Sequence, residues 1–576
     1  MARRLASAGW THRPLRTLGL ASVFVAVRVA MTIAGLTASA SPVLGVHLLV
    51  LPSGSGLYPT IQAAVDVAVD GDVILLAPGV FTGSGNRDID LRGKSITVRS
   101  QFGRADECVL EPSVGGELHR AFVFQSGEGA GTAVEALTVR GAGALGRDGL
   151  NGSGGAVLCI NESAPIFRDC VFLENQAESD GGAISCRESS PTFFACRFEG
   201  NSAPYGGGLF VDRPCLPFGS LAAPPEVVIE RCEFFANSAT DGGGLFARGV
   251  HSRVHLAGVR FSDNFADHGG GIMIHGALAT IDSAAIDHNF AVSEGGGLAL
   301  ESTLFCRPQP ADGQDVIEVQ LAETILCGNV AGSGGAVHIR GYSARFESCT
   351  IAMNDAGDGS GICARSQFPT YPYLPAYVEL AGSIVAFGSL GAAVYQDAHS
   401  SVFADCTNLF GNGGGDWVGE IGEQFGENGN IALDPLFCNP NSGDLGLMAD
   451  SPCQDYPGGC GLIGALPVTC EPSDLPDADD PRVARFGTGH PLRLRAFRNP
   501  FDDRIEGVLA LQAADLIELE LLDVVGRSVG RLDLGPRSAG TIPVAWTLGS
   551  SLPAGAYVLH ATGRRGSVAT PLICVR

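Results

Sequence analysis

Two neighbouring columns of a repeated segment carry side chains that could bind a polymer or act on it. Successive copies place Phe210 and Phe246 at one position, and Asp212 and Arg248 two residues further on. Alternation along a strand directs both positions to solvent, so Phe210 and Phe246 are expected to be exposed. Aromatic rings stack on sugar faces, while arginine and carboxylate groups bind hydroxyl groups or uronates. The pattern predicts a ligand-binding strip with these members: Phe210, Asp212, Phe246, Arg248, His275, Glu301, His338 and Arg340.

The same strip could support catalysis. Neighbouring β-strands are about 4.8 Å apart, so Asp212 and Glu301, three copies apart, would be separated by roughly 14 Å. Paired carboxylates for glycoside hydrolysis need about 5 to 9.5 Å, which excludes this pair. A lyase needs a base and a group that neutralises a uronate, and His275 with Arg248 could fill these roles. His275 and Arg248 are therefore the catalytic candidates if the chain is an enzyme.

A purely structural interpretation of the strip is also open. Three Pro-containing insertions, residues 213–225, 302–315 and 367–376, follow the same segment of the repeat. Loops gathered on one edge of a solenoid commonly wall a binding groove. Alternatively, the phenylalanines pack beneath these loops and the charges pair along the column.

The element that must position the strip is a sequence repeat. Each copy begins with an asparagine, and five or six residues later a glycine-rich segment leads into an aliphatic segment. The copies begin at Asn175, Asn201, Asn237, Asn264, Asn289, Asn329 and Asn354, with spacings of 26, 36, 27, 25, 40 and 25 residues. A unit of about 25 residues is too short for paired-helix repeats and lacks their composition, so it favours a β-coil.

Each unit holds three short bursts of alternating apolar residues. One unit reads Ile184 and Cys186, then Phe193, then Cys196 and Phe198. Three strands per unit predict a three-sided prism with apolar ladders inside, in which cysteines such as Cys170, Cys196 and Cys232 are small apolar rungs. The asparagines are expected to satisfy buried backbone groups at a bend, and the glycines to mark positions without room for a side chain.

These repeats resemble the right-handed parallel β-helix of the pectate-lyase-like superfamily. Residues 58–65, 70–79 and 91–98 are similar to its capping helix and first coils, and the resemblance covers roughly residues 47–466. It implies an all-β fold, a right-handed three-sided parallel β-helix solenoid. It implies no single activity, because the superfamily contains lyases, hydrolases, epimerases and non-catalytic adhesins. The paired-Asp and Gly-His-Gly signatures of polygalacturonase-like members are absent.

Composition and the N-terminus indicate export. With 61 acidic and 37 basic side chains the net charge is −24, which argues against nucleic acids and anionic membranes as partners. Residues 1–40 combine arginines, an apolar run and Ala38-Ser39-Ala40, which predicts a signal peptide cleaved before Ser41; an uncleaved anchor is the alternative. No later segment is expected to span a membrane, and a monomer is expected.

Cysteines and acidic turns suggest two kinds of cross-link. Cys438, Cys453, Cys460 and Cys470 cluster in a turn-rich segment and are the disulfide candidates. No metal site is predicted from the cysteines and histidines, and no cofactor is implied except calcium. Calcium could bridge acidic residues that precede the glycines, although such turns favour aspartate anyway. These residues are Asp180, Asp241, Asp267, Glu294 and Asp358.

The C-terminal quarter of the chain changes character. Beyond the N-terminal cap and first coils (41–100) and the β-helix (101–433), we expect a closing coil (434–470) and a Pro- and Asp-rich linker (471–490). Residues 491–576 predict a small Ig-like β-sandwich. Their motifs, at 499–501, 517–527, 544–546 and 552–558, resemble the C-terminal sorting domains of type IX secretion, although residues 571–576 depart from the usual Lys-containing last strand. An accessory sandwich without a sorting role is the alternative.

Together these patterns predict a secreted or cell-surface β-helix protein. The preferred hypothesis is a non-catalytic protein that binds an extracellular polysaccharide or cell-envelope component along its outer face. A polysaccharide lyase or hydrolase that uses the same face is the second hypothesis. A passive adhesin or envelope spacer is the third. In each case the C-terminal domain would engage the export machinery.

Overall fold

The computed structural model describes residues 45–574, apart from short gaps. In the solenoid and closing segment the gaps are residues 147–149, 214–225, 251, 303–318, 368–373 and 455–458, and residues 471–491 separate them from the C-terminal domain. In that domain the gaps are 496–503, 512–514, 524–526, 538–539, 549–551, 553–554 and 564–565. The predicted signal peptide, the linker and most of the three insertions therefore lie outside the described residues.

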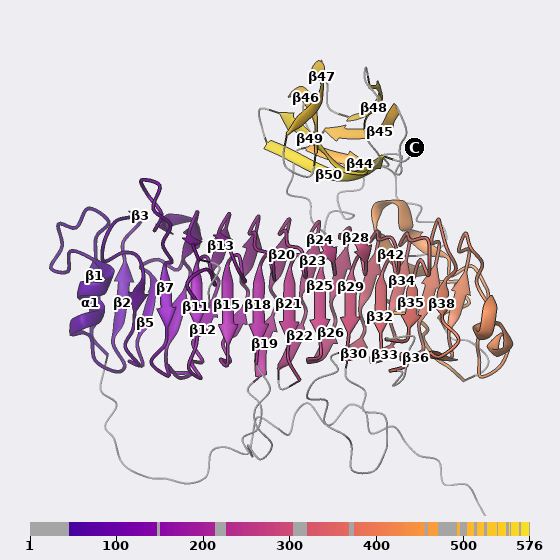
Figure 1. Cartoon of the computed structure of the whole chain (residues 1–576), viewed down its shortest axis with the longest axis horizontal. Helices are drawn as coiled ribbons and strands as arrows, with labels where there is room; N and C mark the ends of the chain where they lie inside the picture. Colours follow the sequence, from indigo (N-terminus) through magenta and orange to yellow (C-terminus); the bar gives the residue numbers. More distant parts are fainter. Residues whose placement is uncertain are drawn as a thin grey trace, which may run out of the picture. The chain divides into compact units, whose positions relative to one another are not determined.

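Residues 45–410 form a parallel β-helix, as the repeat predicts. Three long parallel sheets run along it, and each coil contributes one strand to each sheet. Figure 1 shows the strands side by side in successive coils, from β1 at the indigo end to β38 at the orange end. Neighbouring strands pair in register, so equivalent residues of successive coils stack, as Leu209 stacks on Leu245 and Phe210 on Phe246.

The strands of the three sheets have the following bounds. Sheet A holds β1 (His47–Val50), β2 (Val73–Leu76), β5 (Thr97–Ser100), β8 (Ala133–Glu135), β12 (Ile166–Arg168), β16 (Thr192–Phe194), β19 (Glu226–Glu230), β22 (Arg253–Ala257), β26 (Leu278–Asp282), β30 (Val319–Ala322), β33 (Ser343–Glu347), β36 (Tyr377–Ala381) and β39 (Ser401–Asp405). Sheet B holds β3 (Gly79–Phe81), β6 (Cys108–Leu110), β9 (Thr138–Arg140), β13 (Val171–Leu173), β17 (Arg197–Glu199), β20 (Glu233–Phe235), β23 (Arg260–Ser262), β27 (Ala285–Asp287), β31 (Ile325–Cys327), β34 (Thr350–Ala352), β37 (Ile384–Ala386) and β40 (Asn408–Phe410). Sheet C holds β4 (Ile89–Asp90), β7 (Phe122–Phe124), β11 (Val157–Cys159), β15 (Ile184–Arg187), β18 (Leu209–Asp212), β21 (Leu245–Arg248), β25 (Ile272–His275), β29 (Leu298–Glu301), β32 (Val337–Arg340), β35 (Ile362–Arg365) and β38 (Val394–Gln396).

The core is the interior of this prism. The inward residues of all three sheets form one continuous cluster, and Phe172, Phe198, Phe234 and Phe261 stack inside it. Cys170, Cys196 and Cys232 are buried free thiols in the same interior, as predicted. Each coil has apolar residues on its inner face only, so it buries them only when neighbouring coils are in place.

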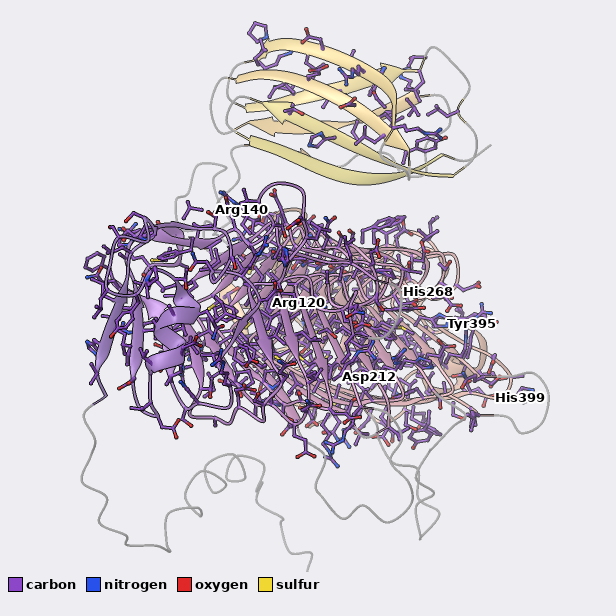
Figure 2. The ribbon with its side chains drawn as sticks, turned by 60° about the vertical axis from the view of Figure 1, so that its left-hand side comes forward. Arg120, Arg140, Asp212, His268, Tyr395 and His399 are labelled. Atoms are coloured by element: carbon purple, nitrogen blue, oxygen red, sulfur yellow. A yellow bond between two sulfur atoms is a disulfide. The ribbon has the colours of Figure 1, made fainter. Side chains whose placement is uncertain are left out.

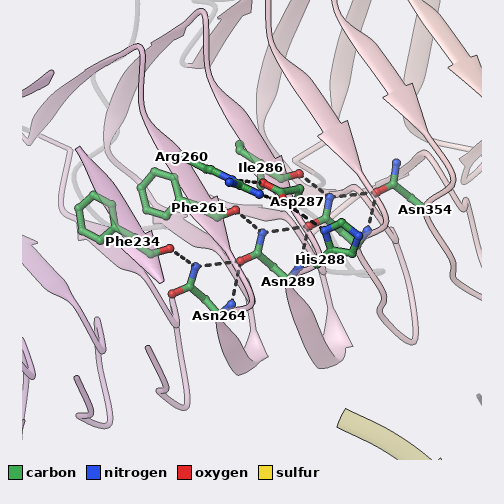
Figure 3. A network of polar contacts seen from close by, with 10 residues as sticks. Phe234, Arg260, Phe261, Asn264, Ile286, Asp287, His288, Asn289 and Asn354 are labelled. Atoms are coloured by element: carbon green, nitrogen blue, oxygen red, sulfur yellow. Dashed lines mark hydrogen bonds and ion pairs between the residues drawn. The ribbon is translucent and has the colours of Figure 1, made fainter. Parts of the chain in front are cut away.

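The asparagines form a buried ladder at the bend between sheets B and C. Asn237 accepts hydrogen bonds at Oδ1 from the backbone N and the side-chain nitrogen of Asn201, at 3.0 and 2.9 Å. Its own Nδ2 donates to the Phe198 carbonyl and to Asn264 Oδ1, at 2.9 and 3.0 Å. The same pattern continues through Asn289 to Asn354 (Figure 3). This arrangement confirms that the asparagines satisfy backbone groups at a bend.

Two further pairs of strands lie in the turns between sheets B and C. They are β10 (Gly143–Ala144) with β14 (Gln176–Ala177), and β24 (Phe265–His268) with β28 (Phe290–Glu294). Bridges between single residues join them into a ladder that crosses the same turns in the other coils.

Helical and closing segments flank the coils. Helix α1 (Ile61–Val67) is capped by the Thr60 hydroxyl and buries Ile61, Ala64 and Val65. The 3-10 helices among the described residues are η1 (Ala105–Glu107), η2 (Gly419–Gln424) and η3 (Pro440–Ser442). None of the helices among the described residues has the length and apolar character needed to span a membrane.

The closing segment, residues 434–470, packs on the outer face of sheet B. Its strands are β41 (Phe437–Asn439), β42 (Asp444–Met448) and β43 (Val468–Cys470). Phe437 and Leu447 bury the outward Ile384 and Ala386, and Gly464 donates a backbone hydrogen bond to the Gly382 carbonyl. This segment therefore covers the apolar outer positions of the last coils.

Two disulfides fasten the closing segment. One joins Cys438 to Cys470, both among the candidates. The other joins Cys460 to Cys406 at the end of the last coil, a cysteine that the sequence did not single out. Cys453, the fourth candidate, is a buried free thiol that accepts a hydrogen bond from Asn408. Clustering in the sequence predicts a disulfide for Cys453, but the group beside its thiol in the structure is the side-chain amide of Asn408.

The C-terminal domain contains two antiparallel sheets. One holds β44 (Leu492–Arg495), β45 (Arg504–Leu511) and β48 (Gly540–Thr547). The other holds β46 (Asp515–Asp523), β47 (Ser528–Arg537), β49 (Gly555–Gly563) and β50 (Gly566–Cys574). Their buried residues, including Leu519, Trp546 and Leu559, form a core of their own.

We expect Asn237→Ala to destabilise the solenoid by about 3 kcal/mol or more, because the buried backbone and amide donors of Asn201 would lose their acceptor, while the Phe198 carbonyl and Asn264 Oδ1 would each lose a donor. Urea unfolding followed by circular dichroism measures the shift of the midpoint. Gln320→Ala removes an exposed amide and is the matched control. Equal midpoints for the two variants would contradict the structural importance of the ladder.

Candidate functional site

The outward residues at the second position of the sheet C strands are buried. We call them the floor column: Ser185, Phe210, Phe246, Met273, Ala299, His338 and Cys363. Phe210, Phe246, Met273 and Ala299 form an apolar cluster outside the main core. The sequence-based expectation that Phe210 and Phe246 are exposed is therefore wrong.

The turn before each sheet C strand explains this burial. Gly242 has a φ of +66°, and a Cβ on it would lie 2.3 Å from the Leu245 carbonyl oxygen. The chain thus folds back tightly, a conformation that favours glycine, and the residue before the glycines lies over the strand that follows. Ser185 Oγ accordingly donates to Asp180 Oδ1 at 2.6 Å.

Two polar columns therefore flank the floor column. The turn column contains Asp180, Tyr205, Asp241, His268, Glu294, Ser333 and Asp358, which pair in sequence along the axis. The strand column contains Arg187, Asp212, Arg248, His275, Glu301, Arg340 and Arg365. Asp212 and His268 are labelled in Figure 2. The eight residues of the predicted strip divide between the floor and strand columns.

Ion pairs occupy most of the arginines. Arg248 donates from Nε and Nη2 to the two carboxylate oxygens of Asp212, at 3.3 and 2.8 Å. Arg187 pairs with Asp180, and Arg340 with Glu294. Arg248 therefore has a carboxylate partner already, which weakens its predicted role as a neutraliser of a uronate. The guanidinium groups of Arg187 and Arg248 also lie over the Phe210 ring, at 5.4 and 5.2 Å, so they help to bury it.

The middle of the two polar columns differs from their ends, because side chains there have hydrogen-bonding groups without a partner in the described structure. Neither the Asp241 carboxylate nor the His275 ring has a hydrogen bond or ion pair within the described part of the chain. Burial raises the pKa of Asp241, although the positive charge of His268 opposes this. Burial also lowers the pKa of His275, an effect that Glu301 opposes and Arg248 reinforces. Both groups can therefore hydrogen-bond with a ligand.

Tyr205 supplies an aromatic surface beside these groups, and the sequence analysis missed it. It is 39% exposed, and its ring lies 5.7 Å from that of Phe246. On the other side of Phe246, the His275 ring lies 6.5 Å away. A signal for Tyr205 was available in the sequence, because this aromatic residue occupies the repeat position that Asp241 occupies in the next copy. We call Tyr205, Asp241, His275 and Glu301 the central patch.

His338 and Arg340, the last members of the predicted strip, lie further along the axis. His338 is buried, with Nδ1 3.2 Å from Ser333 Oγ, so its ring is not offered to a ligand. Burial lowers its pKa to about 4, although the Glu294 carboxylate opposes the change. Burial would raise the pKa of Glu294, but the His268 hydrogen bond and the charges of His338 and Arg340 lower it to about 2.

A shallow groove of about 490 Å³ runs beside the turn column, on the side away from the strand column. Ala144, Ala177 and Ala203 line its floor, and Ser202, Ser238 and Thr240 contribute hydroxyl groups. A smaller hollow of about 360 Å³ shares Leu118, Ala144 and Leu145 with it. The sequence showed the recurring alanine two residues after each asparagine, but not that the alanines leave a groove.

The structure gives little support to a metal centre. In the described ranges, no three His, Cys, Asp or Glu side chains are grouped closely enough to hold a metal ion. Asp180 and Asp358, two of the calcium candidates, are each paired with an arginine of their own coil. Calcium binding stays a prediction.

Comparisons with known proteins found short or distant similarities. Residues 169–187 match the model of the Chlamydia polymorphic membrane protein repeat. No curated protein matches the chain. Similar solved structures include the periplasmic alginate epimerase AlgG, in mutant form (12% identity, TM-score 0.34, covering 63% of this chain and 76% of that chain). Others are the pectate lyase Pel9A (12%, 0.34, 73% and 96%) and XylC in complex with xylose (9%, 0.39, 87% and 100%). The fold is established by the three parallel sheets themselves.

The burial of His338 predicts a pH dependence of stability. Its pKa falls from 6.5 to about 4 on folding, so the unfolded chain binds the proton more readily and stability decreases as the pH falls from 6.5 to 4. Full protonation would cost up to about 3 kcal/mol. Urea midpoints at pH 7, 5.5 and 4 should fall less steeply for His338→Gln than for the wild type. His399→Gln, at an exposed position, should follow the wild type; identical slopes for all three proteins would contradict the assignment.

Proposed function

We propose that this is an exported β-helix protein that binds an extracellular polysaccharide at the central patch on sheet C. The observation that carries the proposal is the exposed ring of Tyr205 beside the Asp241 carboxylate and the His275 imidazole, neither of which has a hydrogen-bond or ion-pair partner in the described structure. Sugars are bound by an aromatic face together with hydrogen bonds at the ring edge, and this patch offers both.

The surroundings of the patch suit a polymer better than a small molecule. Phe246, buried beneath Tyr205 and His275, fixes both rings from below. The columns continue in both directions along the axis without a wall among the described residues, so a chain could extend past the patch. A rigid, preorganised surface lowers the entropic cost of binding.

Export is supported by the two disulfides of the closing segment, since such bonds persist in oxidising compartments. Attachment to a cell surface through the C-terminal domain is part of the proposal and is supported only by the sequence motifs between residues 499 and 558. A passive spacer remains the alternative, and it makes no use of the unpartnered groups of the patch.

Binding assays with immobilised neutral and acidic polysaccharides test the proposal. We expect Tyr205→Ala to raise the dissociation constant about tenfold, the effect of losing one stacked ring, with little change in melting temperature. Phe403→Ala removes an exposed ring from sheet A and serves as the control. Equal affinities for wild type, Tyr205→Ala and the control would refute binding at the patch.

A second candidate function is cleavage of the bound polymer. It is favoured by the raised pKa of Asp241 and the lowered pKa of His275, which bring an acid and a base toward the same pH range. Their positions in adjacent coils would let one group take a proton from a sugar and the other protonate the leaving oxygen.

The cleavage hypothesis predicts new reducing ends or unsaturated uronide absorbance when the purified protein is incubated with polysaccharides. His275→Ala and Asp241→Asn should each reduce the rate by about 100-fold or more, whereas His399→Ala should not. If every polymer stays intact while still binding to the wild type, the protein is a binding protein and not an enzyme.

A further inference from the structure

Arg213 is a buried cation without a counter-ion. It directly follows strand β18 and retains only 9% of its exposed area. Its Nε and Nη1 atoms are buried without a hydrogen-bond partner, and the side chain forms no ion pair among the described residues. Burying a charge without a partner is costly, so such groups normally have a carboxylate or a bound anion beside them.

The backbone of Arg213 packs against the next coil. The Arg213 backbone N donates to the Arg248 carbonyl at 3.3 Å. Gly249, with a φ of +95°, lies so close that a Cβ on it would be 2.1 Å from the Arg213 carbonyl oxygen. The arginine is thus held at the corner after sheet C by its own coil and the following one.

Two described carboxylates next to Arg213, one in sequence and one in the adjacent coil, do not neutralise it. Both oxygens of Asp212, the preceding residue, accept hydrogen bonds from Arg248. Glu188 lies at the same corner of the previous coil, and its backbone N donates to the Asp212 carbonyl at 2.9 Å. The Glu188 side chain is exposed and forms no ion pair with Arg213 in the described structure.

Hydroxyl groups on the neighbouring coil add further free donors. Ser189 and Ser190 directly follow Glu188, and the Oγ atoms of both are buried without a partner. Arg213 and these two serines therefore occupy the same turn in adjacent coils, and each has a buried polar atom without a hydrogen-bond partner. Native proteins rarely leave such groups unsatisfied unless a ligand or ion completes them.

We propose that this corner is an oxyanion-binding site in which Arg213 and the Ser189 and Ser190 hydroxyls bind a carboxylate or sulfate group. A planar guanidinium matches either anion through paired hydrogen bonds. The anion is a substituent of the bound polysaccharide or a free ion. A polysaccharide substituent as the source rests on the proposed function, because Asp212 connects this corner to the strand column. In that case the bound glycan is an acidic one.

Equilibrium dialysis of the purified protein with radiolabelled sulfate tests the site. We expect about one saturable site per chain, and binding at least about tenfold weaker in Arg213→Gln, because a charge-assisted hydrogen bond is lost. Arg253→Gln removes an exposed arginine of sheet A and should bind like the wild type. Arg213→Lys keeps the charge without the planar fork and should bind with intermediate affinity.

Absence of saturable sulfate binding, or equal binding by wild type and Arg213→Gln, would overturn the inference. Melting temperatures of all variants establish that they are folded. Displacement of sulfate by a uronate or sulfated polysaccharide, but not by a neutral one, identifies the glycan as the source; displacement only by small anions identifies a free ion. The Tyr205→Ala assay with neutral glycans is independent, so failure here leaves binding at the central patch untouched.

Discussion

Each coil of this protein satisfies its buried polar groups only through the coils on either side of it. The asparagine ladder is the clearest case, since Asn201, Asn237 and Asn264 each bond to the next member and to a carbonyl of the preceding coil. The requirement for an exact match between coils keeps strands in register over three long sheets. In-register pairing in turn stacks identical positions, so any residue type repeated along the sequence becomes a continuous column in space.

The candidate site is a consequence of that stacking. A tight glycine turn brings one column over the outer face of sheet C, and the strand brings another column beside it. Most charged members of the two columns are paired, either between columns, as Arg187 and Asp180 are, or within one, as Arg248 and Asp212 are. Function is therefore expected where the pairing is incomplete: at Asp241 and His275 in the middle, and at Arg213 at the corner.

The fold was predictable because period and alternation are local properties of the sequence. The three bursts of apolar residues correspond to the three sheets, and the interior positions of Phe198 and Cys196 agree with the prediction. The burial of Phe210 and Phe246 could not be predicted from alternation. Alternation shows that a side chain points outward from its own strand, but not that a preceding turn will cover it. The partner of Cys460 was also beyond prediction, because Cys406 approaches it only once the closing segment folds back onto sheet B.

The separation of the cysteines into two classes has a consequence for handling and biogenesis. Cys170, Cys196 and Cys232 lie in a column inside the coils, where burial raises the pKa of Cys170 and Cys196 and suppresses the reactive thiolate. The native fold thus protects reduced sulfur in the same chain whose closing segment is fastened by disulfides. Once the coils unfold under oxidising conditions, neighbouring thiols would be free to form non-native disulfides before the chain refolds. The lifetime of the native state would then be governed by the rate at which the coils unfold. The presence of a reductant would decide whether denaturation is reversible.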